Sequence, residues 1–261
     1  MSAITRNPLR QKLRAKQTTY GLWVTLESPN VTEAAVALGF DWVVIDMEHG
    51  HLDFREVMEH VRIVRATGTA ALVRVPEIQQ GTIKRVLDMG AQGVILPMVG
   101  TGADVERAFR FGRYPPRGIR GVGGERAVQW GLQFEEYLQS ANEETLLIPL
   151  IETREAAENI EQILGVPGVE AIFFGPADMS ASHGYLGQWE GPGVADLILN
   201  LRAQAAARGI ASGILARSVD NSIIRRDQGF SMIGLGADIN LMMRAARENL
   251  SQLGRPAEFR A

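Results

Sequence analysis

Eight short runs of apolar residues recur along this chain and alternate with amphipathic helical patterns. Nearly every position in the runs is apolar, as in parallel strands that are buried on both faces. Several of the helical patterns end in glycine, which favours a helix C-terminus. Eight strands, each followed by a helix, predict an α/β fold of the (β/α)8 TIM barrel type, with residues 1–261 as a single domain. The predicted strands are Tyr20–Leu26, Trp42–Met47, Ala71–Val75, Gly93–Val99, Leu146–Ile151, Ala171–Phe174, Ile210–Leu215 and Met232–Leu235.

Composition narrows the classes of partner and chemistry. The net charge is −3 and the pI is near 5.9, so nucleic acid is not an expected partner. No apolar run is long enough to cross a bilayer, so no membrane partner is expected. The chain has no cysteine, which excludes disulfides, thiolate metal sites and cysteine nucleophiles.

The first 26 residues are basic, with Arg6, Arg10, Lys12, Arg14 and Lys16 before the first acid at Glu27. A transit peptide and an N-terminal helix both fit this pattern, but a secretory signal does not, because an apolar centre is missing. We interpret the segment as an extra helix before the barrel and expect a cytoplasmic protein.

Lysine is rare, and its positions bear on the reaction type. The three lysines are Lys12, Lys16 and Lys84. None of them ends a predicted strand, where a Schiff-base lysine of a barrel enzyme would lie. Imine catalysis is therefore not expected, and neither is an organic cofactor.

Two irregular features of the chain leave alternatives open. Arg113–Gly131 is the longest irregular stretch, and we expect it to shape the barrel mouth rather than to bind phosphate, because it lacks the P-loop lysine. Gly234–Asp238 fits either a phosphate site after the eighth strand or a tight turn capped by Asp238.

Pro149 cannot donate to a strand ladder, so we expect it at a strand start.

Two apolar runs end at carboxylates: LLIPLIETREA at Glu152 and AIFFGPADMS at Asp178. Each acid could simply favour the first turn of the helix after it. Two acids at the ends of neighbouring buried strands are also a natural seat for a divalent cation. Other strands end in polar residues too, and this repetition favours a site at the carboxyl ends of the strands.

The remaining strand ends supply further candidate residues. His49 is a candidate base, and Arg74 is either a structural partner of an acid or a clamp for an anion or enolate. His49 and His51 form an H-x-H pair that could chelate a metal, but we assign no role to His51 because the strand is expected to end by His49. The strand-end set is Trp23, Asp46, Glu48, His49, Arg74, Glu152, Asp178 and Leu215.

The chain resembles the HpcH/HpaI aldolase family from about residue 20 to 245. The resemblance is carried, in order, by GFDWVVIDMEHG, LVRVP, IKRVLDMG, RYPPRGIRGVG, IETREA and GPADMS. It implies a metal-dependent (class II) pyruvate aldolase on a (β/α)8 barrel, assembled as a hexamer with the last helix exchanged between subunits. Its substrates would be a 2-oxo acid such as pyruvate or hydroxypyruvate, and an aldehyde.

The resemblance also assigns roles to residues. Glu152 and Asp178 match the ligands of a divalent metal, Mg²⁺, Mn²⁺ or Co²⁺. His49 matches the catalytic base, Arg74 the enolate-stabilising arginine, and Asp88 an acid that reaches the histidine of a neighbouring subunit; an ordinary helix-end aspartate is the alternative for Asp88. The substrate pocket would be lined by Trp23, Leu150, Gly175, Pro176, Ala177, Asp178 and Leu215, with Asp46 and Glu48 supporting it from behind and the Ala177 amide holding the substrate carboxylate.

One departure from the family pattern concerns substrate. Many of these aldolases read Gln-Ile-Glu before the metal ligand and contact substrate through the glutamine, whereas this chain reads Leu150-Ile151-Glu152.

Two alternatives to an aldolase remain: a citrate-lyase-like acyl-CoA lyase, or a catalytically silent barrel that acts as a binding protein.

Overall fold

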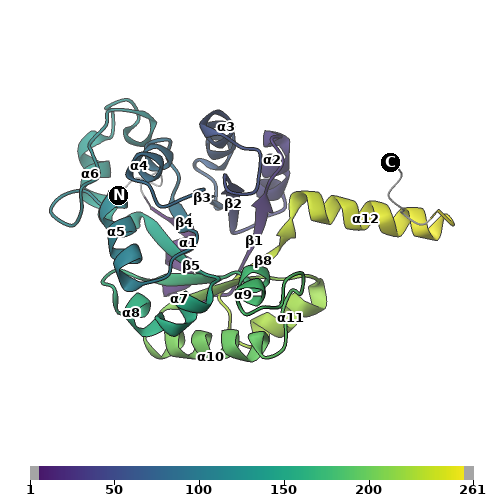
Figure 1. Ribbon diagram of the computed structural model, residues 1–261. Coiled ribbons are helices and arrows are strands. Elements are labelled where there is room, and N and C mark those ends of the chain that lie inside the picture. The colour runs from purple at the N-terminus through teal and green to yellow at the C-terminus, as the bar shows by residue number, and fades with distance from the viewer. Residues whose placement is uncertain (1–5, 256–261) are drawn as a thin grey trace.

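The computed structural model describes residues 6–255 and contains a closed barrel of eight parallel strands (Figure 1). Each strand pairs with the next one in the chain, and β8 closes the barrel on β1. The predicted (β/α)8 fold is therefore confirmed. The strands are β1 (Thr19–Val24), β2 (Trp42–Asp46), β3 (Ala70–Arg74), β4 (Gly93–Leu96), β5 (Leu146–Ile151), β6 (Ala171–Phe174), β7 (Ala211–Leu215) and β8 (Met232–Ala237).

Helices surround this barrel and follow the strands in the expected alternation. Their bounds are α1 (Pro8–Arg14), α2 (Pro29–Ala37), α3 (Phe54–Val64), α4 (Gln80–Asp88), α5 (Gly102–Gly112), the 3₁₀ turn η1 (Arg126–Val128), α6 (Phe134–Glu144), α7 (Arg154–Glu158), α8 (Ile160–Gly165), α9 (Pro176–Ser182), α10 (Val194–Ala207), α11 (Val219–Asp227) and α12 (Asp238–Gln252).

Strands β1 and β4 end two and three residues earlier than the apolar pattern predicts, because the backbone amides that follow them donate to other groups. β1 stops at Val24, and the amides of Thr25 and Leu26 donate to the Asp238 carboxylate instead of a neighbouring strand. β4 stops at Leu96 because Met98 has a φ of +50°, in the left-handed region. Apolar residues thus continue beyond the strands into the loops at their carboxyl ends.

Pro149 lies inside β5 rather than at its start, so the prediction for this residue is wrong. It pairs with Leu96 of β4, and the registered pairs between β5 and β6 are Leu150–Phe173 and Ile151–Phe174. The missing amide hydrogen therefore lies next to the beginning of the β5–β6 pairing, where the barrel tolerates it.

Large aromatic side chains fill the barrel interior. The rings of Trp23 and Phe173 have centroids 5.2 Å apart, and Trp42 meets Phe173 edge-on at 6.0 Å. Trp42 also donates from Nε1 to Thr19 Oγ1 at 3.1 Å. A Cβ added at Gly21 would lie 2.0 Å from the Trp42 ring, so glycine at this position makes room for the indole.

Helix α1 covers the amino-terminal end of the barrel, as the expected extra helix. Asn7 caps it by accepting from the Arg10 amide at 3.2 Å, and Leu9 and Leu13 join the interior apolar cluster. The buried Arg10 anchors the helix through an ion pair of 2.8 Å to Glu170. The barrel is therefore sealed at this end.

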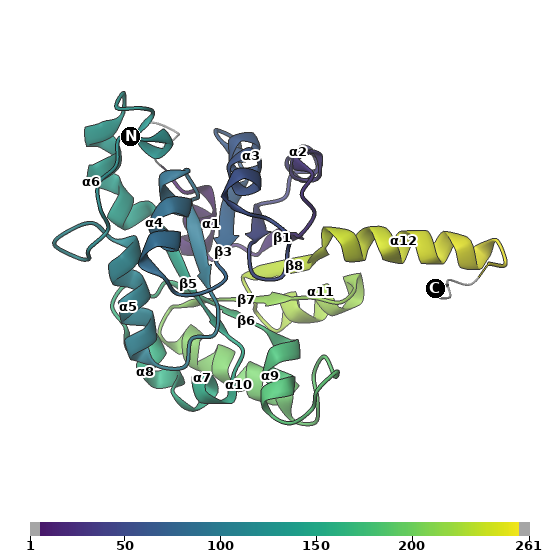
Figure 2. The same cartoon turned by 45° about the horizontal axis from the view of Figure 1, so that its top comes forward.

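Helix α12 projects away from the barrel in both views (Figures 1 and 2). At its start the Asp238 carboxylate accepts from Thr25 Oγ1 at 2.7 Å, from the Leu26 amide at 3.0 Å and from the Ile239 amide at 2.8 Å. The predicted turn capped by Asp238 is wrong, because residues 234–237 continue β8 and α12 begins at Asp238 with Ala237 as its N-cap.

The Arg113–Gly131 segment does not shape the barrel mouth, so that prediction is wrong. It packs along α4: the Ile119 carbonyl accepts from Gln80 Nε2 at 3.3 Å, and Arg126 donates to the Met89 carbonyl. The segment begins just after α5, at the end of a helix that returns the chain to the amino-terminal side of the barrel. The contacts of the segment are with the outer helices α4 and α6 rather than with the strand ends that carry Arg74 and Glu152.

Within residues 6–255, no helix combines the length and apolar character needed to cross a membrane.

The contact between Gly21 and Trp42 yields a stability prediction. Gly21→Ala should lower the free energy of unfolding by at least about 2 kcal/mol, because the new methyl group overlaps a buried ring. Gly68→Ala is the matched control, since a Cβ there meets nothing within 4 Å. Urea unfolding at equal protein concentration measures both variants. Equal midpoints for the two would show that the barrel interior relaxes around Trp42.

Candidate active site

The alternation of side chains along the strands carries several polar residues to the barrel mouth. Leu146, Ile148 and Leu150 of β5 belong to the interior cluster, so the next position of that parity, Glu152, continues the inward row. In the same way Asp46 and Arg74 end β2 and β3 and are registered partners. Asp178 lies in the first turn of α9, directly after β6.

Arg74 is bound by two acids and an aromatic ring. Its Nε donates to Asp46 Oδ1 at 2.9 Å, its Nη2 pairs with Asp46 Oδ2, and its Nη1 lies 2.8 Å from Glu48 Oε2. Its Cζ is 5.5 Å from the Trp23 ring centre. Burial is the largest single influence on the pKa of Arg74 and lowers it, but the hydrogen bond to Asp46 and the charges of Asp46, Glu48 and Glu152 together raise the net pKa. Arg74 thus has the acid partners that a structural role requires. Its contact with substrate stays a prediction.

Glu152 is a buried acid with a single backbone donor. It is 2% exposed, and its Oε1 accepts from the Met98 amide at 2.8 Å. Desolvation raises the pKa of Glu152 to about 7, opposed by the Met98 bond and reinforced by the charges of Glu48 and Asp178. An ionised Glu152 therefore lacks a full complement of partners.

The mouth carries an excess of negative charge. Desolvation also raises the pKa of Glu48, against the effect of Arg74, and Asp46 and Asp178 add to the rise. Glu48, Glu152 and Asp178 thus repel one another, and a divalent cation would relieve that repulsion. The residues present fit such an ion, although residues 6–255 contain no group of three or more His, Asp or Glu placed to enclose one. Two protein ligands leave coordination positions open to substrate and water.

Gly175 brings the end of β6 against Glu152. A Cβ at this position would lie 2.9 Å from both Cβ and Oε2 of Glu152. Only glycine permits this approach without moving the acid. Pro176 follows at the first position of α9 and is buried, and Ala177 and Asp178 are exposed beside it.

The remaining predicted pocket residues lie beneath or beside these polar groups. Trp23 and Leu150 are buried in the interior cluster, so Leu150 belongs to the apolar layer just below Glu152. Leu215 ends β7, is half-buried and packs against the same cluster. Together they form an apolar floor under the carboxylates.

The two histidines differ from the buried acids in being exposed. His49 follows β2, and its amide lies 3.3 Å from Asp46 Oδ1, which ties the loop to the acid that binds Arg74. His51 lies two residues further along the same loop. The role of His49 as a base stays a prediction.

Asp88 lies away from the mouth, at the end of α4. It pairs with Arg120 at 2.7 Å, and the Arg120 side chain is fully buried between Tyr114 and Tyr137, 4.5 and 5.7 Å from its Cζ. Within the chain Asp88 therefore has a partner in the Arg113–Gly131 segment. Its predicted contact with another subunit is not tested by a single chain.

Reasoning from the sequence missed the Met98 contact with Glu152 and the burial of Arg120 beside Asp88, and it did not predict which residues Asp238 binds. The left-handed Met98 that supports Glu152 has no signal beyond the preceding Pro97. Asp238 accepts a hydrogen bond from Thr25, and Arg120 is buried beside Asp88. Both contacts join segments that are far apart in the sequence. The sequence singled out Asp238 only as the cap of a turn, whereas the structure has it at the first position of α12.

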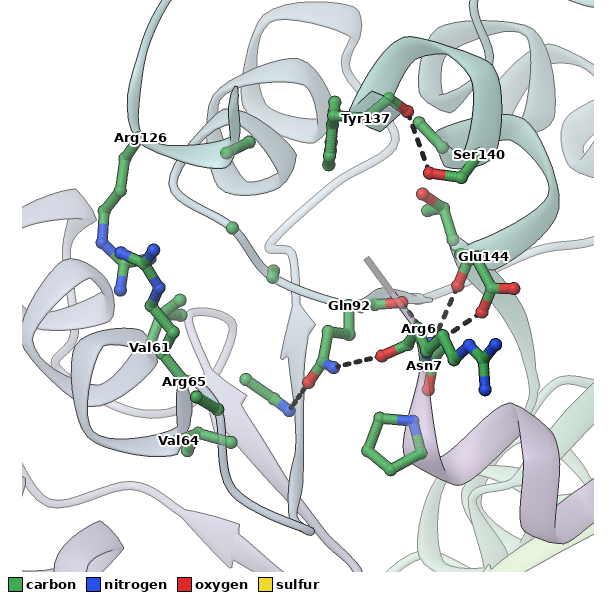
Figure 3. A pocket seen from close by; sticks show the side chains of 18 of the residues that line it. Arg6, Asn7, Val61, Val64, Arg65, Gln92, Arg126, Tyr137, Ser140 and Glu144 are labelled. Carbon is green, nitrogen blue, oxygen red and sulfur yellow. Dashed lines mark hydrogen bonds between the residues drawn. The ribbon is translucent and has the colours of Figure 1, made fainter. Parts of the chain in front are cut away.

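A cavity of about 250 Å³ lies on the opposite, amino-terminal side (Figure 3). Asn7, Gln92 and Glu144 gather at one side of it and Arg65 and Arg126 at the other. A second, open cavity of about 990 Å³ adjoins Ala177 and Asp178. Because the carboxylates and Arg74 are at the mouth, the candidate active site is there and the amino-terminal cavity is separate.

The fold and this site define a (β/α)8 barrel enzyme with an acidic, arginine-containing mouth. The model of the HpcH/HpaI aldolase/citrate lyase family matches residues 19–245. The chain belongs to this family.

Named relatives agree over nearly the whole chain. A hydroxypyruvate/pyruvate aldolase of Paraburkholderia phytofirmans is 36% identical over 97% of this chain and 99% of its own length. A 4-hydroxy-2-oxovalerate aldolase of Novosphingobium aromaticivorans is 37% identical over 94% of this chain and 93% of its own. The crystal structure of an HpcH/HpaI aldolase/citrate lyase family protein from Burkholderia cenocepacia has a TM-score of 0.90 at 35% identity, covering 95% and 99% of the two chains.

Proposed function

We propose that this protein is a divalent-metal-dependent aldolase that forms or cleaves a carbon–carbon bond between a 2-oxo acid, pyruvate or hydroxypyruvate, and an aldehyde. The observation that carries the proposal is the buried Glu152 beside Glu48, Asp178 and Arg74 at the mouth of a barrel of this family. The relatives named hydroxypyruvate/pyruvate aldolase and 4-hydroxy-2-oxovalerate aldolase support it. We further propose that residues 1–261 form one domain and that the enzyme works in the cytoplasm.

Glu152 and Asp178 would hold the metal, Mg²⁺, Mn²⁺ or Co²⁺. When bound, the ion supplies positive charge that stabilises an enolate of the 2-oxo acid. Glu152 suits this role because its carboxylate is buried among like charges and its side chain is held in place by Met98 and Gly175. No organic cofactor is needed.

The chain's own residues account for the other parts of the reaction. In cleavage, His49 takes the proton of the C4 hydroxyl, the C3–C4 electron pair moves toward the enolate oxygen, and the aldehyde leaves. Arg74 faces that oxygen with a positive charge already oriented by Asp46 and Glu48. The Ala177 amide binds the substrate carboxylate, and Trp23 and Leu150 keep water from the floor.

Proton exchange tests the proposal directly. Pyruvate incubated with the enzyme in deuterated water should exchange its methyl protons only when the metal is present, because exchange requires the enolate. Exchange is followed by proton NMR. A protein that binds pyruvate without exchanging it would be the silent barrel, and exchange confined to an acyl-CoA thioester would identify the lyase alternative.

Metal removal gives the first prediction of the proposal. Exhaustive EDTA treatment should abolish aldol cleavage, and Mg²⁺, Mn²⁺ or Co²⁺ should restore it, because two protein carboxylates bind such ions with modest affinity. Cleavage is assayed as pyruvate release. Full activity of the metal-free protein would contradict a class II mechanism.

The second prediction concerns Arg74. Arg74→Ala should lower kcat about 100-fold, because it removes a charge aimed at the enolate oxygen. It should also destabilise the fold by about 3 kcal/mol, because Asp46 is left buried without its partner. Arg74→Lys keeps the charge but not the two-point contact with Asp46, so it should recover stability more than kcat. Loss of stability without loss of kcat per folded molecule would make Arg74 purely structural.

Assembly is part of the proposal: a homo-oligomer, a hexamer, in which α12 is exchanged between subunits. Helix α12 leaves the barrel and carries exposed Met242, Met243 and Leu250. Helix α11 of the barrel exposes Val219 and Ile224. Exchange of α12 between two copies would cover both sets of apolar side chains.

The third prediction tests a shared site. Asp88 lies on the amino-terminal side of the barrel and His49 on the carboxyl-terminal side, so the proposed contact between them joins two subunits. Asp88→Asn and His49→Ala homomers should each be impaired, and reassembled mixtures should regain activity. Thermal stability is measured alongside, because Asp88 also pairs with Arg120. Mixtures no better than either parent, or a fully active monomer, would reject the shared site.

A further inference from the structure

The open cavity beside Asp178 has a composition of its own. It is about 990 Å³ in volume and lies between α9, the segment 186–190 and the start of α11. Ala177 and Asp178 form its border toward the proposed metal site. A molecule that reacts with the bound 2-oxo acid can therefore extend into this cavity.

Three charged side chains line the cavity, and two have assigned partners. Asp178 faces the proposed metal, and Glu190 pairs with Arg225, whose side chain is 4% exposed. The third is Arg217, which forms no ion pair with any carboxylate among residues 6–255. Its Cζ lies 5.8 Å from the ring centre of Trp189, which also lines the cavity. Arg217 is thus a positive charge available to a ligand.

The backbone that carries Arg217 is fixed on both sides. Its amide donates to Asn221 Oδ1 at 3.3 Å, and its carbonyl accepts from Arg244 Nη1 at 3.2 Å. The facing segment is anchored too, because the Gly191 amide donates to Ser180 Oγ at 2.6 Å. The guanidinium and the indole therefore project from anchored segments, which lowers the entropy lost on binding.

We propose that this cavity holds the acceptor aldehyde and that Arg217 selects aldehydes with a carboxylate at the far end. The inference rests on the proposed aldolase function. The aldehyde carbon lies toward Asp178, where it meets the enolate, and the tail crosses the Trp189 ring toward Arg217. A guanidinium matches a carboxylate with two parallel hydrogen bonds, so a tail ending in a carboxylate gains contacts that a neutral tail lacks.

Two acceptors of equal length test the proposal, with pyruvate as donor: 4-oxobutanoate, which has the carboxylate, and butanal, which lacks it. The wild type should show the higher kcat/KM for 4-oxobutanoate. Arg217→Gln should reduce the ratio of the two kcat/KM values about 10-fold, through the anionic acceptor alone. Arg217→Lys should retain part of the preference. Arg154→Gln, an exposed arginine on α7 outside this cavity, is the control and should leave the ratio unchanged.

Pyruvate proton exchange separates this inference from the proposed function. Exchange needs no aldehyde, so Arg217→Gln should exchange at the wild-type rate. If the wild type neither exchanges nor condenses, the aldolase proposal fails. If it exchanges and condenses but Arg217→Gln keeps the wild-type ratio, the aldolase stands and the role of Arg217 is overturned. An equal loss with both acceptors would likewise overturn selection by charge.

Discussion

Burial of acids at the mouth of an apolar barrel is the constraint on which the site depends. Glu152 and Asp46 are 2% and 1% exposed, and neither has enough water to stabilise its charge. Arg74 compensates Asp46 and Glu48, but Glu152 receives only one backbone hydrogen bond. The local structure follows from this imbalance: a left-handed Met98 donates to the acid and Gly175 fits against it, and the proposed cation would supply the remaining positive charge.

Much of the barrel and part of the mouth could be predicted from the sequence, because periodic burial is a local property. Runs of apolar residues located all eight strands, and their ends located Asp46, Arg74 and Glu152. Contacts between distant segments could not be found in this way. Nothing local indicates that Arg120 is buried beside Asp88, or that the Arg113–Gly131 segment packs on α4.

The predicted ends of β1 and β4 were wrong for a related reason. Apolar residues after Val24 and Leu96 look like strand, yet their backbone donors serve Asp238 and Glu152. An apolar pattern indicates burial but not hydrogen-bond partners. It therefore predicts strands that are too long where a buried carboxylate accepts from the backbone amides that follow the strand. The direction of α12 could not be predicted either, because its sequence is that of an ordinary amphipathic helix and does not indicate which surface its apolar face will contact.

Helix α1 closes the amino-terminal end of the barrel with Leu9 and Leu13. The aromatic side chains of Trp23 and Phe173 fill the interior between this end and the mouth. The amino-terminal end of the barrel is thus closed and its interior filled, so a ligand reaches the carboxylates from the carboxyl-terminal side. In the proposed arrangement the 2-oxo acid lies against Glu152 and the aldehyde lies further out, toward Arg217. The inner molecule must enter first and leave last, so the architecture imposes an ordered sequence of arrival and departure.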